Sequence, residues 1–246
     1  MDAQDNVIAW LVPTARGTSA DKATNKLENR HLTTPTTTEG SFLSSRLPAL
    51  SANSPTKALA ISFGQAPKRP GSFVLGTDPE RCDVALPAIP GVSPQHCSLG
   101  FDAESRLVLN DFSEKGTQVW YDWDSNGDQT EYTWILSSGS SHGFPSLVNR
   151  IVIDIQGVRF QIIVNDHSKN WDSYHEKVEK FCQQPAWAAE LSVGWDRASI
   201  APVAPLFSVA PLFQHIFVKS LNDDLAGGMY LWNLAKPWEP MVKAAA

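Results

Sequence analysis

Short apolar runs recur along the middle of the chain, from Ala58 to Val164, with turn-forming residues between them. The runs are ALAISFG, SFVLG, CDVAL, HCSLGF, RLVLNDF, TQVWYDW, EYTWIL, NRIVIDI and VRFQIIV. Each has the length of a β-strand, and no helical period comes between them. Regularly spaced short strands separated by Gly, Pro, Asn and Asp predict an all-β fold, a sandwich or barrel.

Strand patterns also mark the two ends of this region. The last two runs predict a β-hairpin, because isoleucines alternate with other residues from Ile151 to Ile155 and Gln156-Gly157 supplies a turn. Near the amino end, NVIAWLVP is β-branched and aromatic and stops at Pro13. Residues 1–13 are therefore expected to contribute the first strand of the sandwich, whose main part spans residues 57–166.

The stretch between these strand regions, residues 14–56, has a different character. It is rich in Thr and Ser, includes LTTPTTTEG and SANSPT, and its apolar residues follow neither a helix nor a strand period. A polar segment of this kind does not bury enough apolar surface to offset the entropy of ordering. We expect it to be a mobile, disordered insertion.

The pattern becomes helical after residue 166. In SKNWDSYHEKVEKFCQ the apolar residues fall at helical spacing, and Pro185 ends the run, which predicts a short helix over residues 167–184. Residues 185–215 show little period and contain APLF twice, so we interpret them as a Pro-spaced linker. Residues 216–246 form a separate, irregular tail.

Composition narrows the class of protein. The chain has 246 residues, 42% of them hydrophobic, so it can bury a core. It has no apolar run of about 18 residues and no basic leader at its start, which argues against a membrane partner and against secretion. The net charge of −6 and the lack of a Lys/Arg block argue against nucleic acid. Three cysteines without metal or disulfide spacing suit an intracellular location, in cytoplasm or nucleus.

Two short patterns match catalytic or metal-binding motifs only in part. DWDSNG, which begins at Asp122, has the first ligand positions of a calcium loop, but the twelfth position is Thr133 instead of a bidentate carboxylate. Residues 139–143 fit G-x-S-x-G, yet Pro145 and a hairpin follow where a nucleophile elbow needs a helix. We therefore expect no metal, no cofactor and no catalytic residue in this chain.

Residues 73–119 carry four motifs in a recognisable order: FVLG, CDVAL, the Ser-x-x-His of Ser93 to His96, and Gly116-Thr117. At these residues the chain resembles a forkhead-associated (FHA) domain, a β-sandwich that binds phosphothreonine peptides through its loops. The resemblance extends over about residues 57–166. It is greatest to the amino-terminal FHA domains of fungal protein kinases.

The resemblance implies roles for individual residues. Ser93 inherits the serine that hydrogen-bonds the phosphate, since a hydroxyl is small and can donate. His96 inherits a structural role in bracing its loop, and Gly76 is the first signature glycine. Gly116 and Thr117 shape a second binding loop, where glycine accepts the backbone angles of a tight turn.

Two positions depart from the family pattern. Thr77 stands where the family usually has an arginine that meets the phosphate, and Lys115 stands where it usually has an asparagine that holds the peptide. Losing one charged hydrogen bond costs about 1.5–3 kcal/mol, or one to two decades of affinity. Arg81 and Lys115 are the expected replacement charges, with Lys68 and Arg69 also in range by sequence. The predicted phosphopeptide site is thus Ser93, Thr77, Arg81, Lys115 and Thr117.

The tail resembles the opening of a protein-kinase small lobe, in which Lys243 would be the lysine that pairs nucleotide phosphates. The glycine-rich loop departs from the family, because Asp223 and Asp224 would repel an anion there. No H-R-D or D-F-G follows Lys243, so the tail is expected to be a truncated, degenerate remnant without phosphoryl-transfer activity.

These observations predict a non-enzymatic module that binds phosphothreonine peptides in intracellular signalling. Two alternatives stay open: a fragment of an FHA-containing kinase or pseudokinase, and an interaction domain that does not depend on phosphate. Thr36, with Glu39 three residues on, also predicts a phosphorylated insertion that occupies the pocket of the same or another copy, and so self-association.

Overall fold

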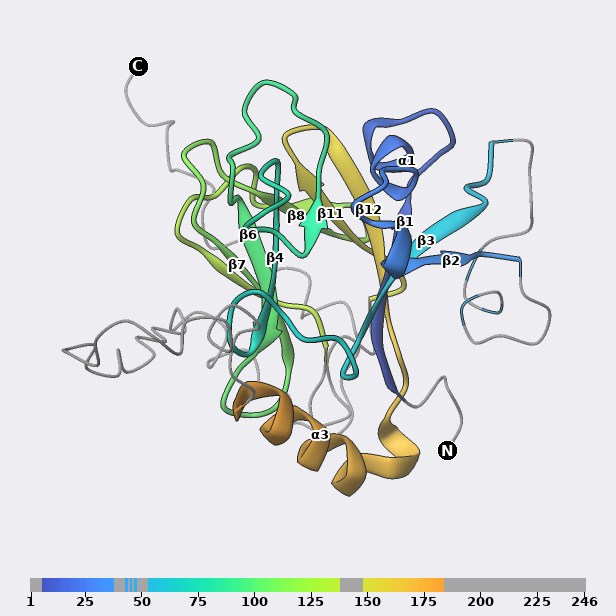
Figure 1. Cartoon of the computed structure of the whole chain (residues 1–246), viewed down its shortest axis with the longest axis vertical. Helices are drawn as coiled ribbons and strands as arrows, with labels where there is room; N and C mark the ends of the chain where they lie inside the picture. Colours follow the sequence, from blue (N-terminus) through green and yellow to red (C-terminus); the bar gives the residue numbers. More distant parts are fainter. Residues whose placement is uncertain are drawn as a thin grey trace, which may run out of the picture. The chain divides into compact units, whose positions relative to one another are not determined.

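Two β-sheets form a sandwich in the computed structural model, which describes residues 6–37, 43, 45, 47, 53–137 and 148–183. Sheet A has the strand order β2-β3-β1-β12-β11-β8-β9, and sheet B the order β10-β7-β6-β4-β5 (Figure 1). The predicted sandwich of short, mostly antiparallel strands is confirmed. Neighbouring strands are antiparallel except for β4 and β5, which run parallel. The strands are β1 (Val7–Pro13), β2 (Thr33–Pro35), β3 (Lys57–Ser62), β4 (Ser72–Gly76), β5 (Val84–Ala85), β6 (Cys97–Phe101), β7 (Leu107–Asp111), β8 (Gln118–Tyr121), β9 (Asp124–Ser125), β10 (Thr133–Ile135), β11 (Ile151–Ile155) and β12 (Val158–Val164).

The hairpin of β11 and β12 forms as the alternation predicts. Ile155 pairs with Val158, so Gln156 and Gly157 are the two loop residues. Both have positive φ, 49° and 91°, which a tight hairpin turn requires and which glycine adopts without strain. β12 continues the sheet by pairing with β1, the strand of the amino end, and β1 pairs in turn with β3.

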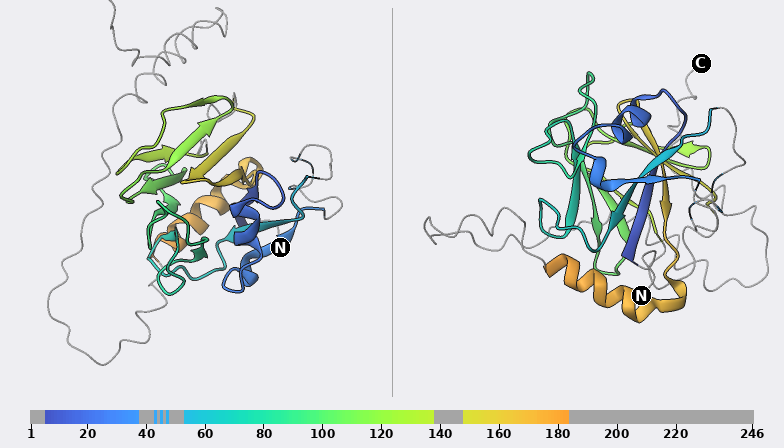
Figure 2. Two further views of the ribbon diagram at one scale, coloured as in Figure 1. Left: turned by 90° about the horizontal axis from the view of Figure 1, so that it is seen from above. Right: turned by 45° about the vertical axis from the view of Figure 1, so that its right-hand side comes forward.

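The polar stretch after β1 is folded over part of its length, so the prediction of a mobile insertion at residues 14–56 is wrong for residues 14–37. Helix α1 (Ser19–Thr24), the 3₁₀ turn η2 (Arg30–Leu32) and strand β2 lie there, and α1 packs on sheet A (Figure 2). The Thr18 side chain caps α1 by accepting from the Asp21 N–H. The prediction of disorder rested on the polar side chains of this segment, and several of those side chains form the hydrogen bonds that order it.

Asn29 shows this most clearly. Its side chain is fully buried, donates to the carbonyls of Ala23 and Ala85 at 2.8 Å each, and accepts from the Ala85 N–H at 2.8 Å. The segment is thereby attached to strand β5. Thr36 is also buried and donates its hydroxyl to the Pro55 carbonyl at 2.7 Å, so in this fold it is not exposed to a kinase. This burial argues against a phosphorylated Thr36 in the pocket, and self-association through the insertion stays a prediction.

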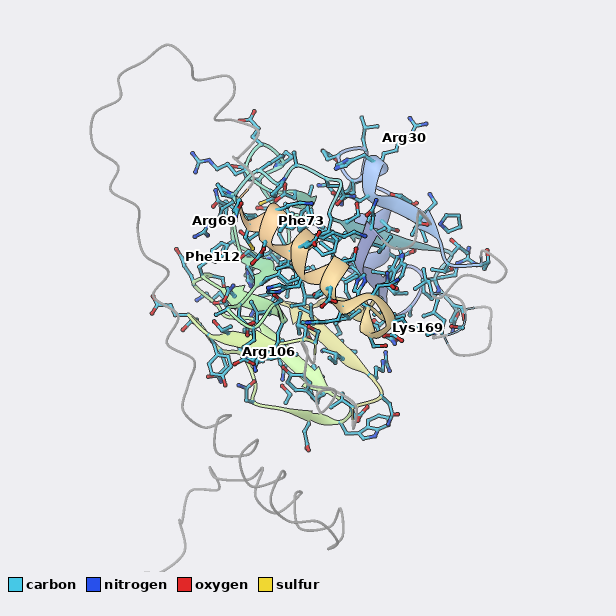
Figure 3. The ribbon with its side chains drawn as sticks, turned by 90° about the horizontal axis from the view of Figure 1, so that it is seen from below. Arg30, Arg69, Phe73, Arg106, Phe112 and Lys169 are labelled. Atoms are coloured by element: carbon cyan, nitrogen blue, oxygen red, sulfur yellow. The ribbon has the colours of Figure 1, made fainter. Side chains whose placement is uncertain are left out.

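Helix α3 (Trp171–Gln183), preceded by the 3₁₀ turn η3 (Ser168–Asn170), closes one end of the sandwich (Figures 1 and 3). Phe181 stacks on Phe73 with a centroid distance of 5.1 Å, and Tyr174 meets Phe63 edge-on at 5.7 Å. The Tyr174 hydroxyl also donates to the Ser105 carbonyl at 3.1 Å. The β11–β12 turn and other loops between strands lie at the opposite end of the described sandwich. We call it the open end.

Several predicted features lie outside the described residues. They are the G-x-S-x-G stretch at residues 139–143, the linker at 185–215, the kinase-like tail at 216–246 and its Lys243. Within the described part of the chain, no helix has the length and apolar character needed to cross a membrane.

Candidate functional site

Three loops meet at the open end of the sandwich: residues 77–83 after β4, residues 91–96 before β6, and residues 112–117 after β7. The first two are tied by backbone bonds, from the Thr77 N–H to the Ser93 carbonyl at 3.2 Å and from the Asp78 N–H to the Pro94 carbonyl at 3.0 Å. Burial raises the pKa of the Cys82 thiol to about 12, so it stays protonated and donates to the Pro94 carbonyl as well.

A hollow of about 410 Å³ lies between the second and third loops. It is lined by Gly91, Val92, Ser93, Pro94, Gln95, Phe112, Glu114 and Lys115. The structure therefore brings together two of the predicted site residues, Ser93 and Lys115, which are 22 positions apart in the sequence. A hydroxyl and an ammonium group on facing loops are donors that suit an anion.

His96 links the two sides of this hollow from beneath. It is fully buried, its Nδ1 accepts from the Ser93 N–H at 3.0 Å, and its Nε2 lies 3.1 Å from the Gly116 carbonyl. A carbonyl only accepts, so Nε2 carries the hydrogen and Nδ1 does not. Burial lowers the pKa of His96, which keeps the ring in this neutral form. The ring acts as a brace and is out of reach of a ligand.

Two glycines are required by close backbone approaches. A Cβ at Gly76 would lie 2.2 Å from the Pro94 carbonyl oxygen, at the point where the first two loops meet. Gly116 has φ of +82°, and its Cβ would lie 2.9 Å from the carbonyl carbon and oxygen of Gln129. The signature glycines thus set the spacing of the loops around the hollow.

Thr117 does not reach the hollow. It is fully buried, and its Oγ1 donates to Asp111 Oδ1 at 2.7 Å. The prediction that Thr117 contacts a peptide is therefore contradicted: its hydroxyl is committed to the protein interior.

Asp111 is the centre of this interior network, which sequence reasoning missed. Besides Thr117 it accepts from the Ser113 hydroxyl at 2.9 Å, from the Ser113 N–H at 3.1 Å and from the Glu131 N–H at 3.2 Å. The sequence does contain a sign of this network, because the strand period places Asp111 on the same inward face as Leu107 and Leu109. A carboxylate at a core-facing position must find donors.

The predicted replacement charges are not all available to the hollow. Arg81 is exposed, forms an ion pair with Asp78 at 3.7 Å, and lies outside the lining of the hollow, as does Thr77. Lys68 lines a different, smaller hollow, and its Nζ donates to the carbonyls of Pro79 and Cys82. Lys68 therefore stabilises the 78–82 turn.

Arg69 lies beside the hollow, on one of its lining residues. Its guanidinium carbon is 5.7 Å from the ring centroid of Phe112, and the two side chains are neighbours in Figure 3. Inside the lining itself the charged groups are Lys115 and Glu114. Glu114 is a carboxylate that sequence reasoning did not consider, and it lowers the positive potential that a phosphate would meet.

No group of three or more His, Cys, Asp or Glu side chains within the described part of the chain is arranged to hold a metal ion. The DWDSNG segment is instead a tight turn between β8 and β9, in which Tyr121 pairs with Asp124. The Asp122 carboxylate accepts from the N–H groups of Asn149 and Arg150. The two residues of the turn are therefore Asp122 and Trp123.

Comparison with known proteins places this site in a family. Residues 73–141 match the sequence model of the FHA domain. No curated protein matches. The FHA domain of MEK1, solved with a HOP1 phosphothreonine peptide, is 22% identical, with 44% of this chain and 89% of that chain covered and a TM-score of 0.29.

Two further solved structures are similar. The FHA1 domain of yeast Rad53 is 14% identical over 75% of this chain and 91% of that chain, with a TM-score of 0.35. The amino-terminal FHA domain of S. cerevisiae Rad53p, in complex with a phosphothreonine peptide, is 24% identical over 40% and 71%, with a TM-score of 0.27. On the match over residues 73–141, which includes both sides of the hollow, this chain contains an FHA domain.

Proposed function

We propose that this chain is a phosphothreonine-binding module and that the phosphate enters the hollow between Ser93 and Lys115. The observation that carries the proposal is the convergence of these two donors in one hollow within the segment that matches the FHA family. Phosphopeptide binding by an FHA domain includes no chemical step, so the proposal assigns no catalytic residue. A role in intracellular signalling belongs to the same proposal.

The chemistry of the hollow sets the strength of binding that we expect. A phosphothreonine brings nearly two negative charges and three acceptor oxygens. Ser93 offers a hydroxyl and Lys115 an ammonium group, whereas Glu114 opposes the anion from the same lining. Because Thr77 replaces the usual arginine, one charged hydrogen bond is missing, which costs about 1.5–3 kcal/mol. Binding should therefore be about one to two decades weaker than in an FHA domain with the full set of donors.

Titration with matched peptides tests the proposal. A degenerate phosphothreonine peptide library supplies a binding sequence, which is then compared by calorimetry with its phosphoserine and unmodified forms. We expect binding of the phosphothreonine form alone, and a loss of about tenfold or more in Ser93→Ala and in Lys115→Ala. Lys169→Ala is the matched control, because Lys169 is exposed beside α3 at the other end of the sandwich.

A phosphate-independent interaction domain is the second candidate, and two observations favour it. Glu114 brings a negative charge into the lining of the hollow, and Arg81 is paired with Asp78 and lies outside that lining. Equal affinity for the phosphorylated and unmodified peptides, unaffected by Ser93→Ala, would establish this candidate in place of ours. The kinase-fragment alternative depends on residues 216–246, outside the described residues, and stays a prediction.

A further inference from the structure

Gln156 lies at the turn between β11 and β12 in sheet A, where β11 pairs with β8, the strand that follows the loop carrying Lys115. Its backbone has φ of 49°, as the two-residue turn requires. Its side chain is directed away from its own hairpin and reaches the loop after β7, about forty positions earlier in the sequence. Reversal of the chain at this turn does not depend on these side-chain contacts, so they serve to connect the turn to the loop after β7.

The side-chain amide of Gln156 meets three acceptors. Its Nε2 lies 3.1 Å from the Lys115 carbonyl, 2.9 Å from the Gly116 carbonyl and 3.3 Å from Asp128 Oδ1. Because all three partners only accept, the amide must present its NH₂ group to them. The Gly116 carbonyl also accepts from His96 Nε2 at 3.1 Å. This carbonyl is thus held by two donors that come from different elements.

The other side of the Gln156 side chain faces the loop that carries Ser93. A Cβ at Gly91 would lie 2.9 Å from Gln156 Oε1 and 3.1 Å from its Cγ. The Gln156 side chain therefore occupies the space that a side chain at position 91 would need. Gly91 and Lys115 both line the hollow, from opposite loops. Gln156 touches both of them without lining the hollow itself.

We infer that Gln156 is a positioning residue that fixes the distance between the Ser93 loop and the Lys115 loop. The inference rests on the proposed function for its effect on peptide affinity, but its effect on the loops stands by itself. Gln156 sets the loops from outside the hollow, while His96 sets them from beneath. Peptide affinity should then depend on a residue that the peptide does not touch.

Two substitutions separate positioning from turn formation. Gln156→Asn keeps a residue that tolerates positive φ, so the hairpin should form and melt as in the wild type, but the amide is one methylene too short to reach the carbonyls. Gln156→Glu keeps the length and places a carboxylate against two carbonyls and Asp128. Gln161→Glu makes the same chemical change on β12 and is the matched control.

Peptide titration and amide hydrogen exchange are measured on all three variants of the full chain. We expect phosphothreonine-peptide binding to weaken about 3- to 10-fold in Gln156→Asn and about 10-fold or more in Gln156→Glu, with Gln161→Glu unchanged. Exchange of the Gly116 and Ser93 amides, which donate to Ser113 Oγ and His96 Nδ1, should become faster in the Gln156 variants alone.

The two readouts distinguish failure of the inference from failure of the proposed function. If the wild-type chain binds no phosphothreonine peptide, the proposed function fails, and the exchange rates still decide whether Gln156 positions the loops. Unchanged exchange at Gly116 in Gln156→Glu overturns the inference. So does wild-type affinity in both Gln156 variants, or an equal loss in Gln161→Glu, which would assign the effect to charge on the hairpin.

Discussion

Thr117 offers the sharpest test of how the site is built, because two roles for it predict opposite results. The structure buries its side chain completely and commits its hydroxyl to Asp111 at 2.7 Å. Replacing Thr117 with Val removes that hydroxyl and keeps the shape of the side chain. If Thr117 holds the loop from within, the substitution should lower stability. If it contacted the peptide, the substitution would lower affinity alone.

The magnitude follows from the contacts that remain. Asp111 would lose one charge-assisted hydrogen bond and keep three, two of them from Ser113 and one from the Glu131 N–H. A hydrogen bond to a charged group contributes about 1.5–3 kcal/mol, so the free energy of unfolding should fall by about that amount. For a chain of this size the loss corresponds to a melting temperature lower by about 3–12 °C.

Urea unfolding and peptide titration of Thr117→Val, side by side with Thr117→Ser, measure both effects. Thr117→Ser keeps the donor and loses one buried methyl group, which costs about 1 kcal/mol, so it should be the more stable variant. Both variants should bind the phosphothreonine peptide within about threefold of the wild type at temperatures where they are folded. A Thr117→Val protein of wild-type stability that no longer binds peptide would refute this reasoning.

Three further predictions concern the loops around the hollow. Gly116→Ala should lower stability by about 1–3 kcal/mol in urea unfolding, because φ is +82° and the new Cβ meets the Gln129 backbone; unchanged stability would contradict it. Glu114→Gln should tighten phosphothreonine-peptide binding by about 2- to 5-fold in calorimetry, since it removes a negative charge from the lining, and weaker binding would show that Glu114 contacts the peptide favourably. Because burial lowers the pKa of His96 in the folded state, the unfolded chain binds more protons below about pH 6.5, so stability should fall as the pH drops from 6.5. Urea unfolding at pH 7.5, 6.5 and 5.5 with NMR titration of the histidines checks this, and a His96 ring that titrates at or above pH 6.5 would contradict it.

The sandwich could be predicted from the sequence because strand alternation and turn residues are local signals. The β11–β12 hairpin is the clearest case, since Gln156-Gly157 follows an alternating strand and the pairing of Ile155 with Val158 leaves those two residues as the loop. The segment at residues 14–37 could not be predicted in this way. Its order depends on Asn29, whose partner Ala85 on strand β5 lies 56 positions away, so a reading of local patterns does not find this contact.

The sequence motifs identified the loops of the candidate site, but the directions of some of their side chains could not be predicted. Ser93 and Lys115 line one hollow, but Thr117 is interior and Lys68 is bound to backbone carbonyls. A motif gives the position of a residue in the chain, not the direction of its side chain. For Thr117 the direction depends on Asp111, a buried carboxylate that accepts hydrogen bonds from three different residues.

The candidate site therefore divides into exposed groups on the lining of the hollow and buried groups that hold the loops. Lys115 and Glu114 are exposed on the lining, whereas His96, Asp111 and Thr117 have at most 5% of their surface exposed. The buried groups are all paired with protein atoms, so changing them removes structure before it removes a ligand contact. Changing an exposed group leaves those pairs intact. Substitutions of Lys115 or Glu114 should then alter affinity at constant stability, and substitutions of the buried set should lower stability while affinity stays close to that of the wild type at temperatures where the chain is folded.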